Sequence, residues 1–391
     1  MYDVAVIGAG PIGSYTAYQL ADRGFDVLLL EEHKAVGVNV VCTGIIGKEA
    51  FERFNIPLDS VLTKIKTLVF VSPSGIRLEY IHPTDLAYIV DRKRFDLGVF
   101  QLAKYKGVEV KLGQRVEEIR EDRYPAHSVT LKTDGDRYRA RIAVIATGVN
   151  YSLQRSVGMG VVKNFLLGAQ TIMPVSTSDS TVEIHTGQKI APGSFAWVVP
   201  VNNRKVRVGV LTENNPKYWL KQFIENRMRQ KILDPDEIRE KPIAFGAIEK
   251  SVNSRVLAVG EAAGQIKTTT GGGIFYGLLC SEIAADVLIK ALRGNIDYLM
   301  QYEQKWRGLL EEEIFMGQQV REVAKRVDDE TLDRMFSRIK KSRFLAKMIV
   351  QRINFEYHGA LLSFGLRMFR SMLNKEKGKR KKDKIAHGRH V

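Results

Sequence analysis

The stretch VAVIGAGPIG at residues 4–13 decides the fold of this chain. Its first four residues form an apolar run typical of a buried parallel strand, and a glycine-rich turn follows directly. In that turn Gly8 allows a tight bend, Gly10 lets the backbone approach a pyrophosphate, and Gly13 lets strand and helix pack closely. We therefore predict that Gly8, Gly10, Pro11 and Gly13 bind a dinucleotide.

The residues after the turn complete a β-α-β unit. Residues 14–23 have a helical pattern that Gly24 ends, and residues 27–30 form a second apolar run. The helix N-terminus offers free N–H groups and a positive dipole end to phosphates. Glu31 ends the second run, where a carboxylate accepts hydrogen bonds from ribose hydroxyls. The unit predicts a Rossmann-type domain.

Composition limits the remaining possibilities. The chain has 391 residues, 45% of them hydrophobic, which is enough for two or three domains. Its two cysteines, Cys42 and Cys280, form no CxxC pair, which favours a reducing, cytoplasmic location without disulfides. The first strand begins almost at residue 1, leaving no room for a signal peptide. We also expect no membrane-spanning helix and no metal site.

Three further segments combine an apolar strand with a turn or a helix start. They are AYIVDRKRFD at residues 87–96, RIAVIATG at 141–148 and VLAVGEAAG at 256–264. Together with GAGPIG, this set resembles the FAD-dependent family that includes p-hydroxybenzoate hydroxylase and the geranylgeranyl reductases. The resemblance implies that Arg92 contacts FAD near its ribose and pyrophosphate. It also implies that Gly148, Gly260 and Glu261 bind FAD, with Glu261 in place of the usual Asp.

The segment VCTG at residues 41–44 resembles the Cys-x-Gly segment of archaeal geranylgeranyl reductases, in which the cysteine lies beside the flavin. Val41 stands where those relatives commonly have Arg. The resemblance implies that Cys42 is catalytic and helps to place or protonate an alkene. A small buried hydrophobic residue is the alternative interpretation of Cys42.

The segment PGSFAWVVP at residues 192–200 resembles the PxxYxWxFP motif of the same reductases. The resemblance implies that Phe195, Trp197 and Pro200 line a substrate cavity, with aromatic faces packed against an isoprenoid chain. Phe195 replaces the Tyr of the motif, so recognition there should be more purely apolar.

The segment KTTTGGGI at residues 267–274 resembles the P-x-T-G-G-G-I turn of the family. The resemblance implies that Gly271, Gly272 and Gly273 lie against the flavin ring. The helix that starts near Ile274 would stabilise negative charge on the reduced ring. Lys267 stands where the family often has Pro.

The expected fold is mixed α/β (α+β) with a discontinuous cofactor domain. Residues 1–150 and 250–295 are predicted to form the Rossmann-type FAD-binding domain. Residues 151–249, with 64–90, are predicted to form an antiparallel substrate sheet, with strands at 161–162, 168–174, 181–185, 195–201 and 205–211. Residues 296–391 are predicted to be a helical C-terminal region with a basic tail.

Basic charge concentrates near the C-terminus. Residues 321–391 hold 20 Lys/Arg and 8 Asp/Glu, which is +12 of the formal net charge of +16. In residues 342–373 apolar side chains recur at helical spacing among cations, and residues 375–384 are polybasic. This pattern is typical of helices that lie on an anionic membrane surface. Packing of these helices on the core of the chain itself is the alternative, and nucleic acid is not an expected partner.

The resemblance implies a geranylgeranyl (prenyl) reductase. Such an oxidoreductase saturates C=C bonds of isoprenoid lipids by hydride transfer from reduced FAD, and therefore acts on CH–CH bonds. A flavin-dependent monooxygenase or halogenase of the same fold is an alternative, and the halogenase would need a lysine such as Lys64 or Lys66 near the substrate. A membrane-associated FAD electron carrier is another. The electron donor, NAD(P)H or a ferredoxin, stays open.

Overall fold

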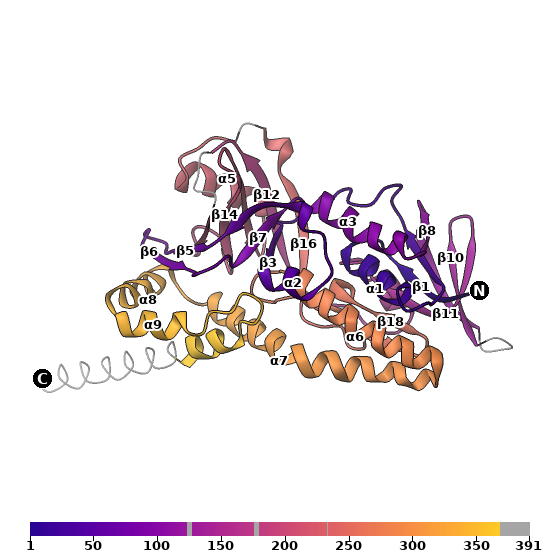
Figure 1. The fold of residues 1–391 in the computed structure, drawn as a ribbon. Coiled ribbons are helices and arrows are strands. Elements are labelled where there is room, and N and C mark those ends of the chain that lie inside the picture. The colour runs from indigo at the N-terminus through magenta and orange to yellow at the C-terminus, as the bar shows by residue number, and fades with distance from the viewer. Residues whose placement is uncertain (123–126, 176–179, 233, 368–391) are drawn as a thin grey trace, which may run out of the picture.

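The computed structural model describes residues 1–122, 127–175, 180–232 and 234–367. Two large sheets lie side by side, and helices of the C-terminal region run beneath both of them (Figure 1). The predicted mixed α/β class is confirmed. The polybasic segment 375–384 and the last apolar residues of the 342–373 pattern lie outside the described residues.

The first sheet has eight strands and contains the glycine-rich turn. Its central path runs β17-β18-β11-β1-β2-β8, and β10 pairs with β11 and β9. Val4 of β1 pairs in parallel with Val27 of β2 on one side and with Ile142 of β11 on the other. The strands are β1 (Tyr2–Ile7), β2 (Val27–Glu31), β8 (Glu109–Leu112), β9 (Val116–Asp122), β10 (Ser128–Thr133), β11 (Arg137–Ile145), β17 (Val252–Asn253) and β18 (Val256–Ala258).

Helices cover this sheet, which explains why its central strands are apolar throughout. Helix α1 (Pro11–Ala21) packs against both α3 (Arg92–Tyr105) and α6 (Ile274–Arg293), and all three contribute to the core that includes β1 and β2. Helix α1 begins three residues earlier than the predicted 14, because Pro11 suits the first helical position. The predicted Rossmann-type β-α-β unit is confirmed.

The second sheet has seven strands in the order β16-β12-β15-β14-β13-β5-β6. The β13–β5 pair is parallel and the other pairs are antiparallel. The predicted strand at 161–162 is wrong, and the strand over 239–245 was missed because Pro242 interrupts its pattern. Proline is tolerated there because β16 is an edge strand. The strands are β5 (Thr67–Val71), β6 (Arg77–Ile81), β12 (Asn164–Met173), β13 (Thr181–Thr186), β14 (Phe195–Asn202), β15 (Lys205–Thr212) and β16 (Arg239–Phe245).

Residues 64–90 are divided between two sheets rather than joining one. Strands β5 and β6 extend the seven-stranded sheet, whereas the three strands of a separate small sheet are β3 (Ile45–Gly47), β4 (Val61–Ile65) and β7 (Ala87–Val90). The shorter elements are α2 (Lys48–Arg53), η1 (Leu58–Ser60), α4 (Ser152–Ser156), α5 (Pro216–Gln222), η2 (Phe223–Arg227), η3 (Pro235–Glu237), η4 (Gly260–Ala263) and η5 (Ile296–Leu299).

The described part of the C-terminal region, residues 296–367, is mostly helical, and no helix in the described ranges is long and apolar enough to cross a membrane. Its helices are α7 (Met300–Ala324), α8 (Asp329–Lys341) and α9 (Arg343–Val350), and residues 359–367 are helical. Helices α8 and α9 contain no buried residue. They therefore leave most of their surface outside the core.

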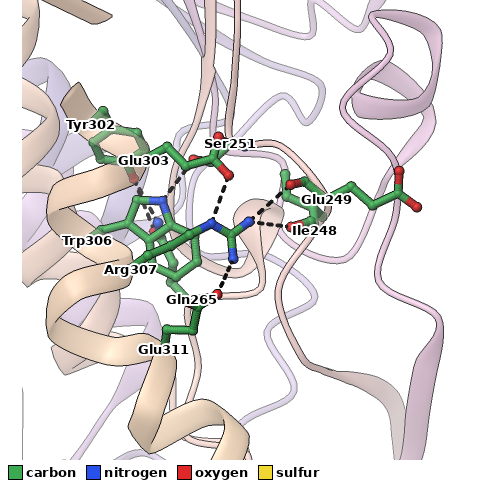
Figure 2. Close-up of polar contacts among 9 residues, drawn as sticks. All are labelled: Ile248, Glu249, Ser251, Gln265, Tyr302, Glu303, Trp306, Arg307 and Glu311. Atoms are coloured by element: carbon green, nitrogen blue, oxygen red, sulfur yellow. Dashed lines mark hydrogen bonds and ion pairs between the residues drawn. The ribbon is translucent and has the colours of Figure 1, made fainter. Parts of the chain in front are cut away.

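Helix α7 is fixed to the first sheet by a buried polar network (Figure 2). Trp306 Nε1 donates to Ser251 Oγ at 2.8 Å, and Gln265 Nε2 donates to the Tyr302 hydroxyl at 2.9 Å. Gln265 Oε1 in turn accepts the backbone N–H of Gly260 at 2.7 Å. The network therefore connects α7 to the turn that follows β18.

Candidate functional site

A cavity of about 740 Å³ is lined by residues from all three sheets and from the C-terminal region. It brings together predicted site residues that lie far apart in the sequence. Those that line it are Gly8, Gly10, Pro11, Glu31, Cys42, Arg92, Gly148, Phe195, Trp197, Glu261, Gly271, Gly272, Gly273 and Ile274. Gly13, Pro200 and Gly260 do not line it.

The first glycine-rich turn has one glycine that faces open space. A Cβ on Gly10 would meet no atom within 4 Å, and the backbone there has an ordinary φ of −63°. In contrast, a Cβ on Gly13 would come within 2.0 Å of the Gly8 carbonyl oxygen. Gly13 therefore serves packing, whereas Gly10 leaves room in the cavity. That open cradle at a helix N-terminus fits the pyrophosphate of a dinucleotide.

Glu31 lies at the end of β2, beside this turn. Its Oε2 accepts the backbone N–H of Ala9 at 2.8 Å, and its Oε1 lies 2.7 Å from Nδ1 of His33. His33 also lines the cavity, although the sequence motif gave no signal for it. The carboxylate is thus held at the cavity edge, where ribose hydroxyls could reach it.

Arg92 occupies the start of α3, because Asp91 caps that helix by accepting the N–H groups of Lys93 and Arg94. Its guanidinium donates to both carboxylate oxygens of Asp96, at 3.0 and 3.2 Å. Burial alone would raise the pKa of the Cys42 thiol, but the charge of Arg92 and the N–H of Gly44 hold that pKa below its ordinary value. Arg92 therefore acts on Cys42 as well as lining the cavity.

The loop that carries Cys42 is held from the second sheet. Gln170 Nε2 on β12 donates to the Cys42 carbonyl oxygen at 3.1 Å, and Arg207 on β15 donates to the Thr43 carbonyl oxygen. Cys42 is partly exposed, and it faces the cavity. The other cysteine, Cys280, is 0% exposed and does not line the cavity.

The segment VLAVGEAAG at residues 256–264 brings Glu261 next to a lysine of strand β16. Glu261 Oε2 accepts a hydrogen bond from Lys241 Nζ at 3.0 Å, and both residues line the cavity. Gly260 lies behind them with a φ of +71°, and a Cβ there would come within 2.9 Å of Ile12. Lys241 was missed because it belongs to β16, the strand that the sequence did not reveal.

Strand β14 supplies the aromatic wall. The rings of Phe195 and Trp197 lie 5.9 Å apart between centroids, and both face the cavity together with Val199. Pro200 was expected to join them but points to the opposite face, because side chains alternate along a strand. Among the described residues, Trp197 Nε1 is a buried nitrogen without a hydrogen-bond partner.

The second glycine-rich turn, KTTTGGGI at residues 267–274, is held by helix α7. Arg321, which is 9% exposed, donates to the carbonyl oxygens of Thr268 and Thr269 at 3.2 and 3.3 Å. Its guanidinium also stacks 4.2 Å from the ring centroid of Phe245, and burial lowers its pKa to about 10. Arg321 thereby fixes the segment that presents Gly271 to the cavity.

The sequence did not reveal that residues 353–362 form another wall. The residues of this segment that line the cavity include Ile353, Phe355, Glu356, His358 and Leu361. Glu356 could have drawn attention, because it is the single acidic residue within 342–373. The C-terminal pattern therefore belongs partly to the core, as one of the two sequence interpretations proposed.

Comparisons with known proteins identify the family of the chain. The family model described as "Lycopene cyclase protein" matches residues 3–349. A digeranylgeranylglycerophospholipid reductase of Methanococcoides burtonii is 30% identical over 365 residues, which cover 88% of this chain and 88% of the relative.

Solved structures share the fold. A geranylgeranyl bacteriochlorophyll reductase-like protein from Thermoplasma acidophilum has a TM-score of 0.78 at 21% identity, covering 93% of this chain and 95% of that one. A probable FAD-dependent monooxygenase from Pseudomonas aeruginosa has a TM-score of 0.68 at 15% identity, covering 86% and 99%. With the sequence match over most of its length, the chain belongs to the geranylgeranyl reductase family of oxidoreductases, as its motifs predicted.

Proposed function

We propose that this protein binds FAD and saturates C=C bonds in geranylgeranyl chains of isoprenoid lipids. One observation carries the proposal: a single cavity joins the open cradle at Gly10 to the aromatic wall of Phe195 and Trp197, with Cys42 between the two sheets. In this proposal residues 1–150 and 250–295 form the cofactor domain, apart from the strands within 64–90 that join other sheets. Bound FAD would supply the hydride.

The residues of the chain would orient and isolate the reacting groups. Gly10 and the N-terminus of α1 would hold the pyrophosphate, and Glu31 would bind the ribose. Phe195 and Trp197 would hold the isoprenoid chain by apolar contact, since that chain offers few polar groups. An unactivated alkene accepts hydride poorly, so a dry wall that fixes it in place is required.

The alternatives of the same fold receive less support from the site. A halogenase would need a lysine near the substrate, but Lys64 and Lys66 lie near Asp85, with nitrogen–oxygen distances of 3.8 and 3.9 Å, and neither lines the cavity. An electron carrier has no need of a long apolar wall. The experiment described next distinguishes the reductase from a monooxygenase.

The test uses chemically reduced enzyme, so that the result does not depend on whether NAD(P)H or a ferredoxin is the natural donor. Purified protein with stoichiometric FAD is reduced by dithionite without oxygen and mixed with a geranylgeranyl ether lipid. We expect mass spectrometry to show products heavier by pairs of hydrogen atoms. Trp197→Ala should chiefly weaken lipid binding. Oxygen insertion under air without any hydrogenated product would favour the monooxygenase.

We also propose that helices α8 and α9 dock on an anionic membrane surface. Phe344 is 74% exposed and Val350 is 44% exposed, and the exposed cations Lys341, Arg343 and Lys347 lie on the same helices. Exposed apolar side chains next to cations are typical of a peripheral membrane contact. The wall formed by residues 353–362 follows α9 directly, so a lipid substrate would have a short path into the cavity.

A further inference from the structure

Strand β16 is an edge strand of the second sheet, yet it forms part of the cavity wall. Lys241 and Ile243 line the cavity and the intervening Pro242 does not, because side chains alternate along a strand. Lys241 Nζ donates to Glu261 Oε2 at 3.0 Å, and a Cβ on Gly271 would come within 3.0 Å of Ile243. Strand β16 therefore contacts both the segment that carries Glu261 and the second glycine-rich turn.

The ion pair of Lys241 and Glu261 lies next to the first glycine-rich turn. Gly260, which precedes Glu261, packs so closely on Ile12 that an added Cβ would come within 2.9 Å of that side chain. Ile12 belongs to the first glycine-rich turn. A Cβ on Gly148 would lie 3.6 Å from Glu261 Oε2. The pair is therefore beside the part of the cavity that we propose to hold the pyrophosphate.

Both partners of this ion pair are accessible from the cavity. The side chain of Lys241 is 36% exposed and that of Glu261 is 22% exposed, and both residues line the cavity. Among the described residues, Glu261 Oε2 is the one hydrogen-bond acceptor of Lys241 Nζ. An ammonium group has three N–H donors, so two donors of Lys241 are available to a ligand.

The other cations that line the described part of the cavity are less available to a ligand. Arg92 donates to both carboxylate oxygens of Asp96, and its side chain is 15% exposed. Lys267 is 8% exposed and is ion-paired with Glu356. Arg115 is 66% exposed, so most of its side chain is in contact with solvent. Lys241 is therefore the lining cation that best combines a position inside the cavity with free donors.

The charge of the cavity wall makes such a cation important for an anionic ligand. Histidines apart, more acidic than basic side chains of the described residues line the cavity. They are Glu31, Glu32, Asp96, Glu261 and Glu356 against Arg92, Arg115, Lys241 and Lys267. A pyrophosphate is itself anionic, and carboxylates close to it repel it. The N-terminus of α1 and an accessible ammonium group beside it would offset this repulsion.

We propose that Lys241 is a cofactor-binding residue, whose ammonium group contacts the phosphate-bearing segment of FAD while Glu261 holds it in place. This role rests on the proposed binding of FAD. A lysine binds phosphate as a point charge through charge-assisted hydrogen bonds, which are stronger than neutral ones. The competing role for Lys241 is to orient Glu261 without contacting the cofactor, and the measurements below separate the two roles.

The experiment titrates FAD into full-length apoprotein and follows the change in flavin fluorescence. Lys241→Met should weaken FAD binding roughly tenfold or more, because it removes a charged donor. Lys241→Arg should retain most of the affinity, since it keeps the charge. Equal FAD affinities in Lys241→Met and wild type would overturn the proposal. Failure of wild-type protein to bind FAD would instead refute the proposed function.

Lys217 provides a matched control on the same strand. Its Nζ lies 3.2 Å from Oε2 of Glu240, the residue before Lys241, and neither Lys217 nor Glu240 lines the cavity. Lys217→Met removes the same charge and also breaks an ion pair of β16, but it should leave FAD affinity nearly unchanged. Equal losses in Lys217→Met and Lys241→Met would trace the effect to net charge or to β16 as a whole, and would contradict the proposal.

A second background separates contact with the cofactor from orientation of Glu261. If Lys241 acts only through Glu261, Lys241→Met should cause no further loss of FAD affinity in a Glu261→Gln protein. If the ammonium group contacts phosphate, Lys241→Met should weaken FAD binding in both backgrounds. Absence of a further loss in the Glu261→Gln background would therefore rule out the direct contact.

The salt dependence of binding gives a measure that does not require the Glu261 variant. Dissolved ions screen the attraction between ammonium and phosphate, so FAD affinity should fall more steeply with salt in wild type than in Lys241→Met. Parallel salt profiles would refute the contact. Thermal melts of the apoproteins verify folding, and Lys241→Gln, which keeps a polar side chain, replaces Lys241→Met if that variant does not fold.

Discussion

The backbone N–H of Ala9 donates a hydrogen bond of 2.8 Å to Oε2 of Glu31, which ties the first glycine-rich turn to the end of the neighbouring strand. The turn that we propose to hold the pyrophosphate and the carboxylate that we propose to bind the ribose are therefore already oriented relative to each other. A dinucleotide would meet a site that needs little reordering, which lowers the entropic cost of binding. Within this turn, the ligand-facing role of Gly10 and the packing role of Gly13 can be distinguished by experiment.

The first prediction contrasts two glycine substitutions. Gly10→Ala should leave the thermal stability of the apoprotein unchanged, because its Cβ meets nothing within 4 Å, but should strongly weaken FAD binding. Gly13→Ala should destabilise the apoprotein by roughly 1–3 kcal/mol, because its Cβ would come within 2.0 Å of the Gly8 carbonyl oxygen. Thermal melts of apoprotein and flavin-fluorescence titrations measure the two effects. Wild-type FAD affinity in Gly10→Ala would contradict the assignment of the cradle.

The second prediction concerns the protonation of Cys42. Arg92→Gln should raise the thiol pKa, because it removes a cation that favours the thiolate, and the thiolate fraction at neutral pH should then fall. The rate of iodoacetamide alkylation as a function of pH measures this shift. Cys280 should contribute little, since it is 0% exposed and burial raises its pKa. Arg92→Lys serves as the charge-preserving control, and an unshifted profile in Arg92→Gln would remove Arg92 as the cause.

The first glycine-rich turn and Glu31 could be predicted from the sequence because local backbone chemistry fixes those positions. The second glycine-rich turn and the aromatic wall were implied by the family resemblance. The pair Arg92 and Asp96 was also within reach, because its i, i+4 spacing on a helix favours an ion pair. The ion pair between Lys267 and Glu356 could not be predicted, because the two residues are 89 positions apart in the sequence and meet only when the C-terminal segment folds back onto the cavity. Strand β16 was hidden for a different reason, the proline that an edge strand tolerates.

The third prediction tests the network that fixes α7. Ser251→Ala should lower the free energy of unfolding by roughly 1–3 kcal/mol, because it leaves the buried indole N–H of Trp306 without its acceptor. Glu311→Gln removes only a 61% exposed partner of Arg307 and should cost at most about 1 kcal/mol. Denaturant unfolding of the two variants gives the comparison. Equal losses would mean that the buried bond contributes no more than the exposed one.

The fourth prediction addresses the α8–α9 surface and avoids deletion of the C-terminus, because removal of residues 353–362 would also open the cavity. Lys341→Glu should weaken binding to anionic liposomes at least about fivefold at low salt, since each basic residue near such a surface contributes roughly 1 kcal/mol. Phe344→Ser should weaken it by loss of apolar contact.

Lys132→Glu is the control for this prediction, because Lys132 is an exposed residue of β10, at the opposite end of the molecule from α9 (Figure 1). Lys132→Glu changes the net charge by the same amount as Lys341→Glu. If the membrane contact is confined to α8 and α9, Lys132→Glu should leave liposome binding nearly unchanged. Liposome co-sedimentation over a range of salt concentrations makes the measurement, and binding should weaken as salt screens the charges. Equal losses in the two charge variants would show a diffuse attraction of the whole protein, and absence of wild-type binding at low salt would refute the membrane contact of α8 and α9.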